Sequence, residues 1–258
     1  MNIQEIIAHM ESMRNETESH NLMRFFKTEH PHDYGYGDHF LGIRVPQTRQ
    51  IVRKCKDIKV DDIPILLQSE WHEIRFCGLM IMVDRFEACT KKQVVGQRNA
   101  VQMRDHILDL YLQHADRVNN WDLVDMTAPK ILGHWLLLPT LRYGQEPSTA
   151  TAEKIRLMDD LAASANLWEQ RMSMVSTWKT SQQGDPSWCI RYAKKHIQHP
   201  HDLMQKAVGW MLREMGKRTD MNLLRSFLQV HVHEMHRTTL RYAIELMDAQ
   251  ERRFWMNQ

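Results

Sequence analysis

An indole and a carboxylate lie four residues apart in the segment NNWDLVDMTAPKIL, at Trp121 and Asp125. In a helix, this spacing places both side chains on one side, one turn apart. A carboxylate can stabilise positive charge that develops during a reaction, and the face of an indole attracts cations. The pair is therefore a candidate for chemistry that passes through a cation. Packing is an alternative explanation, in which Trp121 belongs to the core and Asp125 is a surface or capping acid.

A second candidate is a stripe of basic and aromatic side chains after Pro200. Its members follow one another at i, i+4, i+7 and i+11: Lys206, Trp210, Arg213 and Lys217. Apolar residues at other positions of the same segment can supply packing. Lysines and arginines neutralise phosphates, and a tryptophan between them adds an aromatic contact, so the stripe is typical of nucleic-acid binding. A solvated charged face above a packed Trp210 explains the pattern about as well.

Arg171 borders a third aromatic and apolar stripe, because it follows Trp168 by three residues and precedes Trp178 by seven. Its guanidinium could bind a phosphate through two parallel hydrogen bonds. Stacking on Trp168 or pairing with Glu169 is the alternative. Arg44 near the N-terminus and Arg237 near the C-terminus could extend a positive surface, although simple solvation explains any single one of them.

The elements that must position these residues are predicted to be helices. The chain has 258 residues, of which 43% are hydrophobic and 26% charged, so it can bury a sizeable core and is not of the disordered class. It contains only 10 glycines and 8 prolines, and good helix formers dominate the rest. We therefore expect an all-α protein. The net charge of +2 does not by itself indicate a nucleic-acid partner.

The sequence gives no sign of a metal site, a cofactor or a membrane span. Its four cysteines form no CxxC pair and stand beside no suitable histidine cluster: Cys55, Cys77, Cys89 and Cys189. The N-terminal segment MNIQEIIAHMESMRNE carries acids and reads as a first helix rather than a signal peptide. No apolar run approaches the roughly 18 residues of a membrane span. We expect a cytoplasmic protein.

Five helical segments align with one another and indicate an internal repeat. The alignment places one residue of each segment at an equivalent position: Arg75, Asp125, Arg171, Lys206 and Thr239. Their offsets drift between about 33 and 50 residues, close to the helix-pair period of HEAT-like repeats. Stacked helix pairs leave a continuous concave face, which is the natural binding surface. At this position one repeat carries an acid, Asp125, where three others carry a base, whereas Asp122 is out of register.

Clusters of turn-forming residues separate the repeats, at 30–38, 139–149, 182–187 and 198–202. The longest insertion, around 139–152, falls between the second and third copies. No low-complexity linker divides the chain. We therefore expect a single α-helical domain over residues 1–258.

These segments closely resemble the AlkD family of DNA alkylation repair glycosylases from about residue 20 to about residue 250. Family members carry a Trp and an Asp four residues apart in a WDLVD-type segment, an Arg in a WxxR-type segment and a Trp in a QKAxGWxLRE segment. The matching residues here are Trp121, Asp125, Arg171 and Trp210. The insertion near 139–152 departs from the most compact family pattern.

The resemblance implies a HEAT-like α-solenoid with a concave DNA-binding groove and a monofunctional glycosylase activity on cationic purines such as 3-methyladenine and 7-methylguanine. It assigns Asp125 to stabilising an oxocarbenium-like sugar, Trp121 and Trp210 to contacting the deoxyribose, and Arg171 to a backbone phosphate. It also implies that the lesion is read through the DNA backbone, so that a deep base-sized pocket is not required.

We expect a monomer that binds double-stranded DNA containing alkylated bases. Lys206, Arg213, Lys217, Arg44 and Arg237 are the predicted DNA-binding residues. Two alternatives remain open: a non-catalytic HEAT-like protein that binds damaged or branched DNA, and a protein–protein scaffold. The basic stripe argues against the scaffold, which has no need to align charges of one sign. The preferred adduct does not follow from the sequence.

Overall fold

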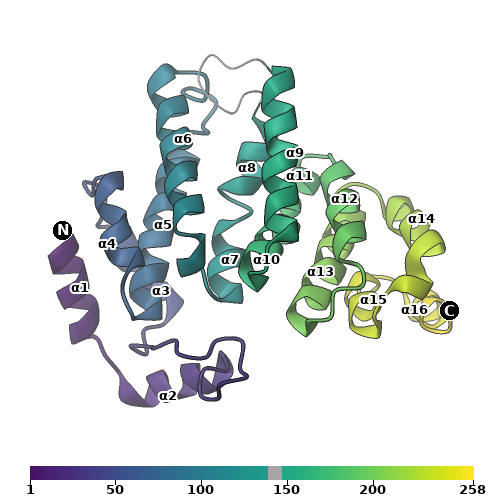
Figure 1. Cartoon of the computed structure of the whole chain (residues 1–258), viewed down its shortest axis with the longest axis horizontal. Coiled ribbons are helices and arrows are strands. Elements are labelled where there is room, and N and C mark those ends of the chain that lie inside the picture. Colours follow the sequence, from purple (N-terminus) through teal and green to yellow (C-terminus); the bar gives the residue numbers. More distant parts are fainter. Residues whose placement is uncertain (139–146) are drawn as a thin grey trace. The chain divides into compact units, whose positions relative to one another are not determined.

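The structure of the protein is a computed structural model that describes residues 1–138 and 147–258, and Figure 1 shows it as a cartoon. The described residues form sixteen α-helices and three short 3-10 helices, with no β-strand. The prediction of an all-α protein is confirmed. Residues 139–146, the first part of the predicted insertion, lie outside the described part of the chain, and α9 begins directly after them.

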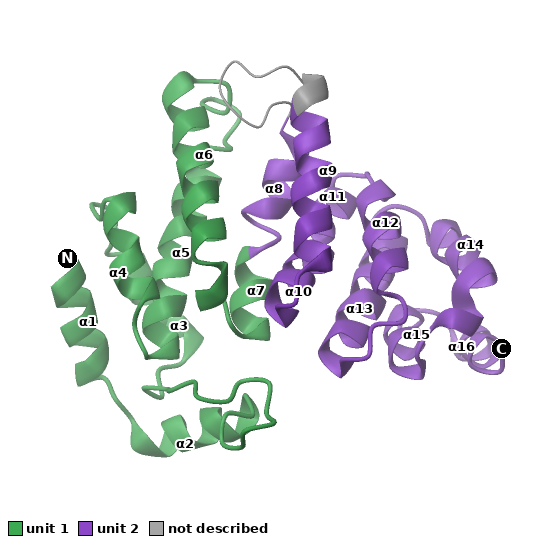
Figure 2. Ribbon diagram, viewed as in Figure 1, with its two compact units in different colours: residues 1–127 green, residues 128–258 purple. Residues whose placement is uncertain are grey.

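The chain divides into two compact units, residues 1–127 and residues 128–258, which Figure 2 colours separately. Each unit is described by itself below. The expectation of one domain and of a concave groove along the whole chain therefore stays a prediction.

The first unit contains seven α-helices among residues 1–127, and two short 3-10 helices connect some of them. Its helices are α1 (Ile3–Ser12), α2 (Glu16–Phe25), α3 (Val45–Val52), η1 (Val60–Asp62), α4 (Ile63–Leu67), α5 (His72–Ala88), α6 (Arg98–Gln113), η2 (Ala115–Arg117) and α7 (Trp121–Thr127). Helix α5 is the centre of the unit, because it is buried along most of its length and contacts α3, α4, α6 and α7. The long loop between α2 and α3 includes the predicted turn cluster at 30–38.

The second unit is built around α13, which contacts α10, α11, α12, α14 and α15. Its helices are α8 (Leu132–Leu137), α9 (Pro147–Ala163), α10 (Leu167–Val175), α11 (Thr177–Gln182), α12 (Ser187–His196), α13 (Asp202–Arg218), α14 (Met221–His231), η3 (Val232–Glu234), α15 (Arg237–Ala243) and α16 (Ala249–Met256). Helix α13 crosses α15 closely at Gly209, where a Cβ atom would lie 2.3 Å from the carbonyl oxygen of Thr239. A larger residue there would force the two helices apart.

The helical repeat of the sequence has a clear structural counterpart. The five aligned residues all lie within the first five positions of a helix: Arg75 in α5, Asp125 in α7, Arg171 in α10, Lys206 in α13 and Thr239 in α15. Helices pack in consecutive pairs, among them α4 with α5, α9 with α10 and α12 with α13. The helical-repeat prediction is thus confirmed within each unit. None of the helices that the structure describes is long and apolar enough to cross a membrane.

Candidate active site

The helix that carries Trp121 and Asp125 is short and is held at both ends. Its first residue follows Asn120, whose side-chain oxygen accepts the backbone N–H of Trp121 at 2.8 Å and whose carbonyl accepts that of Val124 at 3.1 Å. At its last residue, the Thr127 hydroxyl hydrogen-bonds the Tyr111 hydroxyl of α6 at 2.8 Å. Because α7 has under two full turns, these contacts and not its intrinsic propensity fix its direction.

Trp121 and Asp125 line one cavity of about 390 Å³, which lies entirely within the first unit. The predicted i, i+4 pair thus faces a common space, and Arg44 lines the same cavity. The other lining residues are Leu22, Phe25, Phe26, Phe40, Ile43, Val45, His72, Glu73, Phe76, Asp122 and Met126. Aromatic and aliphatic side chains dominate the wall, and α7 contributes two of its three carboxylates, Asp122 and Asp125.

The indole of Trp121 is oriented by two phenylalanines of the segment that ends α2. Its ring lies nearly parallel to that of Phe26, with 5.2 Å between centroids and 25° between planes. Phe25 meets it at a steeper angle of 69°, with centroids 5.9 Å apart. Such contacts restrict the rotamer of a half-buried Trp, so the indole is held in place before any ligand arrives.

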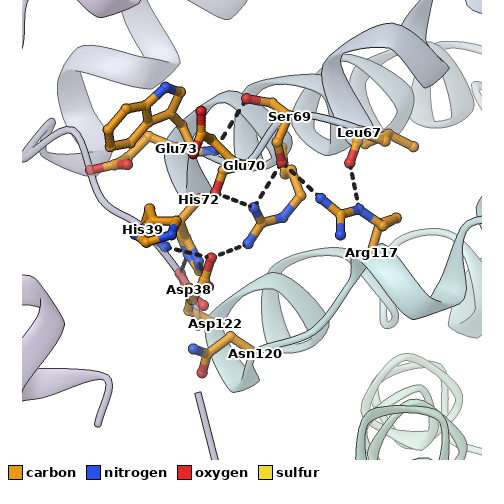
Figure 3. Close-up of polar contacts among 12 residues, drawn as sticks. Asp38, His39, Leu67, Ser69, Glu70, His72, Glu73, Arg117, Asn120 and Asp122 are labelled. Carbon is orange, nitrogen blue, oxygen red and sulfur yellow. Dashed lines mark hydrogen bonds and ion pairs between the residues drawn. The ribbon is translucent and has the colours of Figure 1, made fainter. Parts of the chain in front are cut away.

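A buried cluster of four charged residues underlies this wall. His72, at the start of α5, places Nδ1 2.8 Å from Asp38 Oδ2 and Nε2 2.9 Å from Asp122 Oδ2. Arg75 donates from Nη2 to the other oxygen of Asp38 at 2.5 Å. Figure 3 shows Asp38 and Asp122 converging on His72 from different parts of the chain. Since Asp122 belongs to α7, the cluster ties the helix of Trp121 and Asp125 to α5.

Both ring nitrogens of His72 face carboxylate oxygens, an arrangement in which a doubly protonated imidazole donates a hydrogen bond to each. Burial alone lowers the pKa of His72, but the charges and hydrogen bonds of Asp122 and Asp38 outweigh it and raise that pKa to about 9. For the acid Asp38, burial acts in the opposite direction and raises the pKa. The hydrogen bonds and charges of His72 and Arg75 outweigh it and bring the pKa of Asp38 below its ordinary value. His72 is therefore an imidazolium near neutral pH.

Another buried carboxylate shapes the loop that forms the cavity rim. Glu73 accepts three backbone N–H groups, from Leu41 at 2.9 Å, Gly42 at 2.9 Å and Ile43 at 3.0 Å. Gly42 has a φ of +85°, and a Cβ there would lie 2.3 Å from the carbonyl oxygen of Asn15. The turn thus requires glycine, and Glu73 satisfies the N–H groups that the turn directs inward.

The structure places the predicted phosphate ligand Arg171 in the interior of the second unit. The residue is 5% exposed, and its Nη1 donates to the carbonyl oxygen of Leu203 at 2.5 Å. Arg75, at the equivalent repeat position, similarly donates Nη1 to the carbonyls of Ser69 and Glu70 at 3.0 and 2.9 Å. In both copies the arginine therefore fixes a neighbouring segment of backbone. For Arg171 that segment is the first turn of α13, the helix of Trp210.

The basic stripe of α13 is helical as predicted, and acids accompany two of its cations. Lys206 Nζ lies 2.6 Å from a carboxylate oxygen of Asp202, one turn earlier. Arg213 pairs with Glu245 and also lies 3.8 Å from Glu214. Lys217 is exposed and Trp210 is half-buried. The positive field of this face is consequently weaker than a count of its cations indicates.

The two remaining predicted DNA-binding residues are exposed and lie in different units. Arg44, with 70% of its side chain exposed, lines the cavity and pairs with Glu18 at 3.1 Å. Arg237, at the start of α15, donates to the carbonyl oxygen of Met256 at 2.5 Å. Both are accessible to an anionic ligand, and neither has a role that the structure alone assigns.

Sequence reasoning missed the residues that position the site: His72, Asp38, Asp122, Glu73 and Phe26. The usable signals were a His-Glu pair at the start of α5 and an aspartate out of register with the repeat. Neither signal predicts which residues pair, because His72 is 34 positions from Asp38 and 50 positions from Asp122 in the sequence. Within residues 1–138 and 147–258, no group of three or more His, Cys, Asp or Glu side chains could hold a metal ion.

Comparison with known proteins gives matches of two kinds, to solved structures and to a protein family. A solved structure described as a predicted DNA alkylation repair enzyme from Enterococcus faecalis has a TM-score of 0.64 at 14% sequence identity, covering 92% of this chain and 98% of that chain. At this identity the likeness establishes the fold. No curated protein matches the sequence. The family of DNA alkylation repair enzymes matches residues 6–247, nearly the whole length of the sequence, and the chain belongs to that family.

Proposed function

We propose that the protein is a monofunctional DNA glycosylase that hydrolyses the N-glycosidic bond of cationic N-alkylated purines in duplex DNA, with 3-methyladenine and 7-methylguanine as substrates. Membership of the DNA alkylation repair family supports a role in repair. The observation that carries the finer proposal is the cavity that Trp121 and Asp125 line together, from one helix held at both ends.

The chemistry suits these residues. Alkylation at a ring nitrogen makes the purine cationic and a good leaving group, so the glycosidic bond can break without a strong general acid. As it breaks, positive charge develops on the sugar, and a fixed carboxylate stabilises that charge. Asp125 takes this role and orients the attacking water, while Trp121 offers its indole to the same positive centre.

Hydrolysis is proposed instead of lyase chemistry. A Schiff base needs a lysine amine at the reacting carbon. The residues that line the cavity of the first unit include no lysine. The product is therefore an intact strand with an abasic site.

Duplex DNA is the proposed partner of a monomeric protein, with a cytoplasmic, nucleoid-associated location. Trp210, Lys206, Arg213, Lys217, Arg44 and Arg237 are the proposed contacts to the sugar–phosphate backbone, together with Arg171. Contacts of this kind position a protein on DNA without reading sequence.

The direct test is incubation of the protein with duplex DNA methylated at purine ring nitrogens, followed by chromatography of the released bases. We expect 7-methylguanine and 3-methyladenine in solution and alkali-labile abasic sites in the DNA. Heat-inactivated protein gives the spontaneous rate of depurination. Release no faster than that rate would leave the protein as a non-catalytic binder of damaged DNA.

A neutral lesion should be left untouched. If the charge of the base supplies most of the driving force, uracil and 1,N6-ethenoadenine stay in the DNA under conditions where 7-methylguanine is released. Asp125 and Trp121 favour positive charge, and the proposed mechanism assigns no residue to protonate a neutral leaving group. Time courses on matched duplexes that differ in one base measure this selectivity. Efficient excision of uracil would point to a general acid outside this scheme.

Replacement of Arg171 should weaken binding of damaged and undamaged duplex alike. Each phosphate contact contributes about 0.9 to the slope of log K against log salt, so Arg171→Ala should make that slope shallower by about this amount. Because Arg171 also holds the carbonyl of Leu203, the free energy of unfolding is measured alongside. Arg156→Ala is the matched control, since Arg156 is an exposed cation of the same unit and is not among the proposed contacts, so the slope should not change. An unchanged slope with lower stability would make Arg171 a purely structural residue.

A further inference from the structure

Trp121 and Asp125 are carried by a helix that cannot fix its own orientation. Helix α7 has seven residues, which is too short for stability in isolation, so its position depends on the contacts of its side chains. Asn120 and Thr127 hold its two ends, and Asp122 lies between them. At about 100° per residue, Asp122 lies about 60° around the helix axis from Asp125. A rotation of α7 therefore moves the two carboxylates together.

The carboxylate of Asp122 is directed at His72. His72 Nε2 donates to Asp122 Oδ2 over 2.9 Å, and the Asp122 side chain is only 16% exposed. Its other oxygen, Oδ1, is buried and accepts no hydrogen bond from the residues that the structure describes. A buried oxygen without a partner lowers stability. The placement of Asp122 therefore points to a role other than stability.

His72 is a rigid anchor for this hydrogen bond, as Figure 3 shows. Its Nδ1 lies 2.8 Å from one oxygen of Asp38, and Arg75 donates to the other oxygen. The rings of Phe40 and Phe26 lie against the imidazole, with centroids 4.5 and 5.3 Å from it. The imidazole cannot turn without breaking several of these contacts, so it fixes the position of the carboxylate that it binds.

Phe26 gives α5 and α7 a second connection. Its ring contacts both the imidazole of His72 and the indole of Trp121, with centroid distances of 5.3 and 5.2 Å. Helix α7 is thus joined to α5 by a hydrogen bond at Asp122 and by an aromatic contact at Trp121. A change in the length of the side chain at Asp122 should therefore displace Trp121 and Asp125 in the cavity that they line.

We propose that Asp122 and His72 are positioning residues for catalysis, because their hydrogen bond holds α7 in the orientation that presents Trp121 and Asp125 to the DNA. This inference rests on the proposed glycosylase function and adds two residues that act on its rate through other side chains. A misplacement of about 1 Å can lower the rate of a catalysed reaction about 100-fold. In this role the geometry of Asp122 matters more than its charge, which distinguishes it from an acid that stabilises the sugar cation directly.

Two conservative substitutions separate geometry from charge. Asp122→Asn removes the charge but keeps the side-chain length and an oxygen that can accept from His72, whereas Asp122→Glu keeps the charge and adds one methylene. In single-turnover release of 7-methylguanine, we expect Asp122→Glu to be at least about tenfold slower than wild type and Asp122→Asn to stay within about threefold of it. A loss in Asp122→Asn as large as that in Asp122→Glu, or no loss in either, would overturn the proposal.

The matched control is Asp116→Glu, because Asp116 belongs to the same unit but is exposed and lies outside the cavity. It should release bases at the wild-type rate. Affinity for undamaged duplex is measured for each variant, and a positioning role predicts a lower rate at unchanged affinity. Thermal unfolding shows that each variant is folded at the assay temperature. If Asp122→Glu does not fold, Asp122→Ser replaces it, since serine is too short to reach His72, and the same loss of rate is expected.

Combination with Asp125→Asn tests whether Asp122 acts through Asp125. In the Asp125→Asn background, Asp122→Glu should slow base release by a smaller factor than in wild type, because the displaced side chain no longer carries the stabilising charge. If the two losses multiplied fully, Asp122 would act independently of Asp125, and the proposal would be wrong.

The position of Trp121 can also be followed without any glycosylase step. The chain has 8 tryptophans, and after labelling with fluorotryptophan the fluorine resonance of Trp121 is the one that is missing from Trp121→Phe. We expect Asp122→Glu to shift or broaden this resonance, and Asp122→Asn and Asp116→Glu to leave it in place. An unchanged resonance in folded Asp122→Glu would show that Asp122 does not orient α7.

The two readouts separate this inference from the proposed function. A selective shift of the Trp121 resonance, with no base release by wild-type protein, would remove the glycosylase and keep Asp122 and His72 as the residues that orient α7. Base release by wild-type protein, with an unshifted resonance and an unchanged rate in Asp122→Glu, would keep the glycosylase and remove the positioning role.

Discussion

Replacement of Asp125 by asparagine is expected to abolish most base release while DNA binding stays intact or becomes slightly stronger. The carboxylate faces the cavity, where positive charge would develop on the sugar, and asparagine keeps its shape without its charge. Loss of an electrostatic stabiliser of this kind costs about 100- to 1,000-fold in rate. Binding does not suffer, because a negative charge near phosphates opposes association.

Single-turnover release of 7-methylguanine measures the rate, and fluorescence anisotropy with undamaged duplex measures binding. Asp116→Asn is the matched control, since Asp116 belongs to the same unit but is exposed and lies outside the cavity. It should behave as wild type in both assays. If Asp125→Asn released bases at the wild-type rate at pH 7, Asp125 would have no part in stabilising the transition state.

The helical fold follows from the sequence because the responsible forces are local. Few glycines or prolines interrupt the chain, and capping residues such as Asn2, Asn15 and Asp248 hydrogen-bond the first turns of their helices. Division of the chain into two units after Thr127 is not a local property. It depends on which helices contact one another, and no composition shift marks that place in the sequence.

The sequence predicts those contacts of the candidate site that lie within one helix, and it does not predict those between distant segments. Trp121 and Asp125 share a helix, so their spacing alone predicts that they face one space, and the cavity bears this out. Lys206 and Asp202 are likewise one turn apart, and their pairing was accessible from spacing. By contrast, Arg213 pairs with Glu245, which is 32 positions away in the sequence. The sequence therefore does not predict that acids weaken the positive field of the basic stripe.

The burial of Arg171 illustrates a limit of repeat arguments. Alignment of the repeats identifies equivalent positions, but a position shared by Arg75 and Arg171 can serve packing as readily as binding. Both guanidiniums bond backbone carbonyls in the interior. The exchange of a base for an acid at Asp125 is the informative event, because an acid there cannot donate the same hydrogen bonds.

Substitution of His72 is expected to have the largest effect on stability in the first unit. His72→Gln removes the positive charge between Asp38 and Asp122 and leaves two carboxylates without their shared partner. Loss of one member of a buried ion cluster destabilises a protein by about 3 to 5 kcal/mol. Chemical denaturation followed by circular dichroism measures the free energy of unfolding. His106→Gln is the control, because the pair of His106 with Asp61 is exposed and should contribute under about 1 kcal/mol.

The same cluster gives the protein a definite dependence on pH. The pKa of His72 is about 9 in the folded protein and near the ordinary 6.5 in the unfolded chain, so the folded state holds this proton more tightly. Its stabilising contribution is therefore complete below about pH 6.5 and is lost as the pH rises through 9. At about 1.4 kcal/mol for each unit of pKa, the loss amounts to roughly 3 kcal/mol.

In His72→Gln this contribution is absent, so the gap in unfolding free energy between wild type and variant should narrow by about that amount between pH 6.5 and 10. Taking the difference removes the other groups that titrate there, such as Lys154, whose pKa burial lowers to about 8. A constant gap over this range would mean that His72 is neutral in the folded protein, and that one of its two carboxylates carries the proton instead.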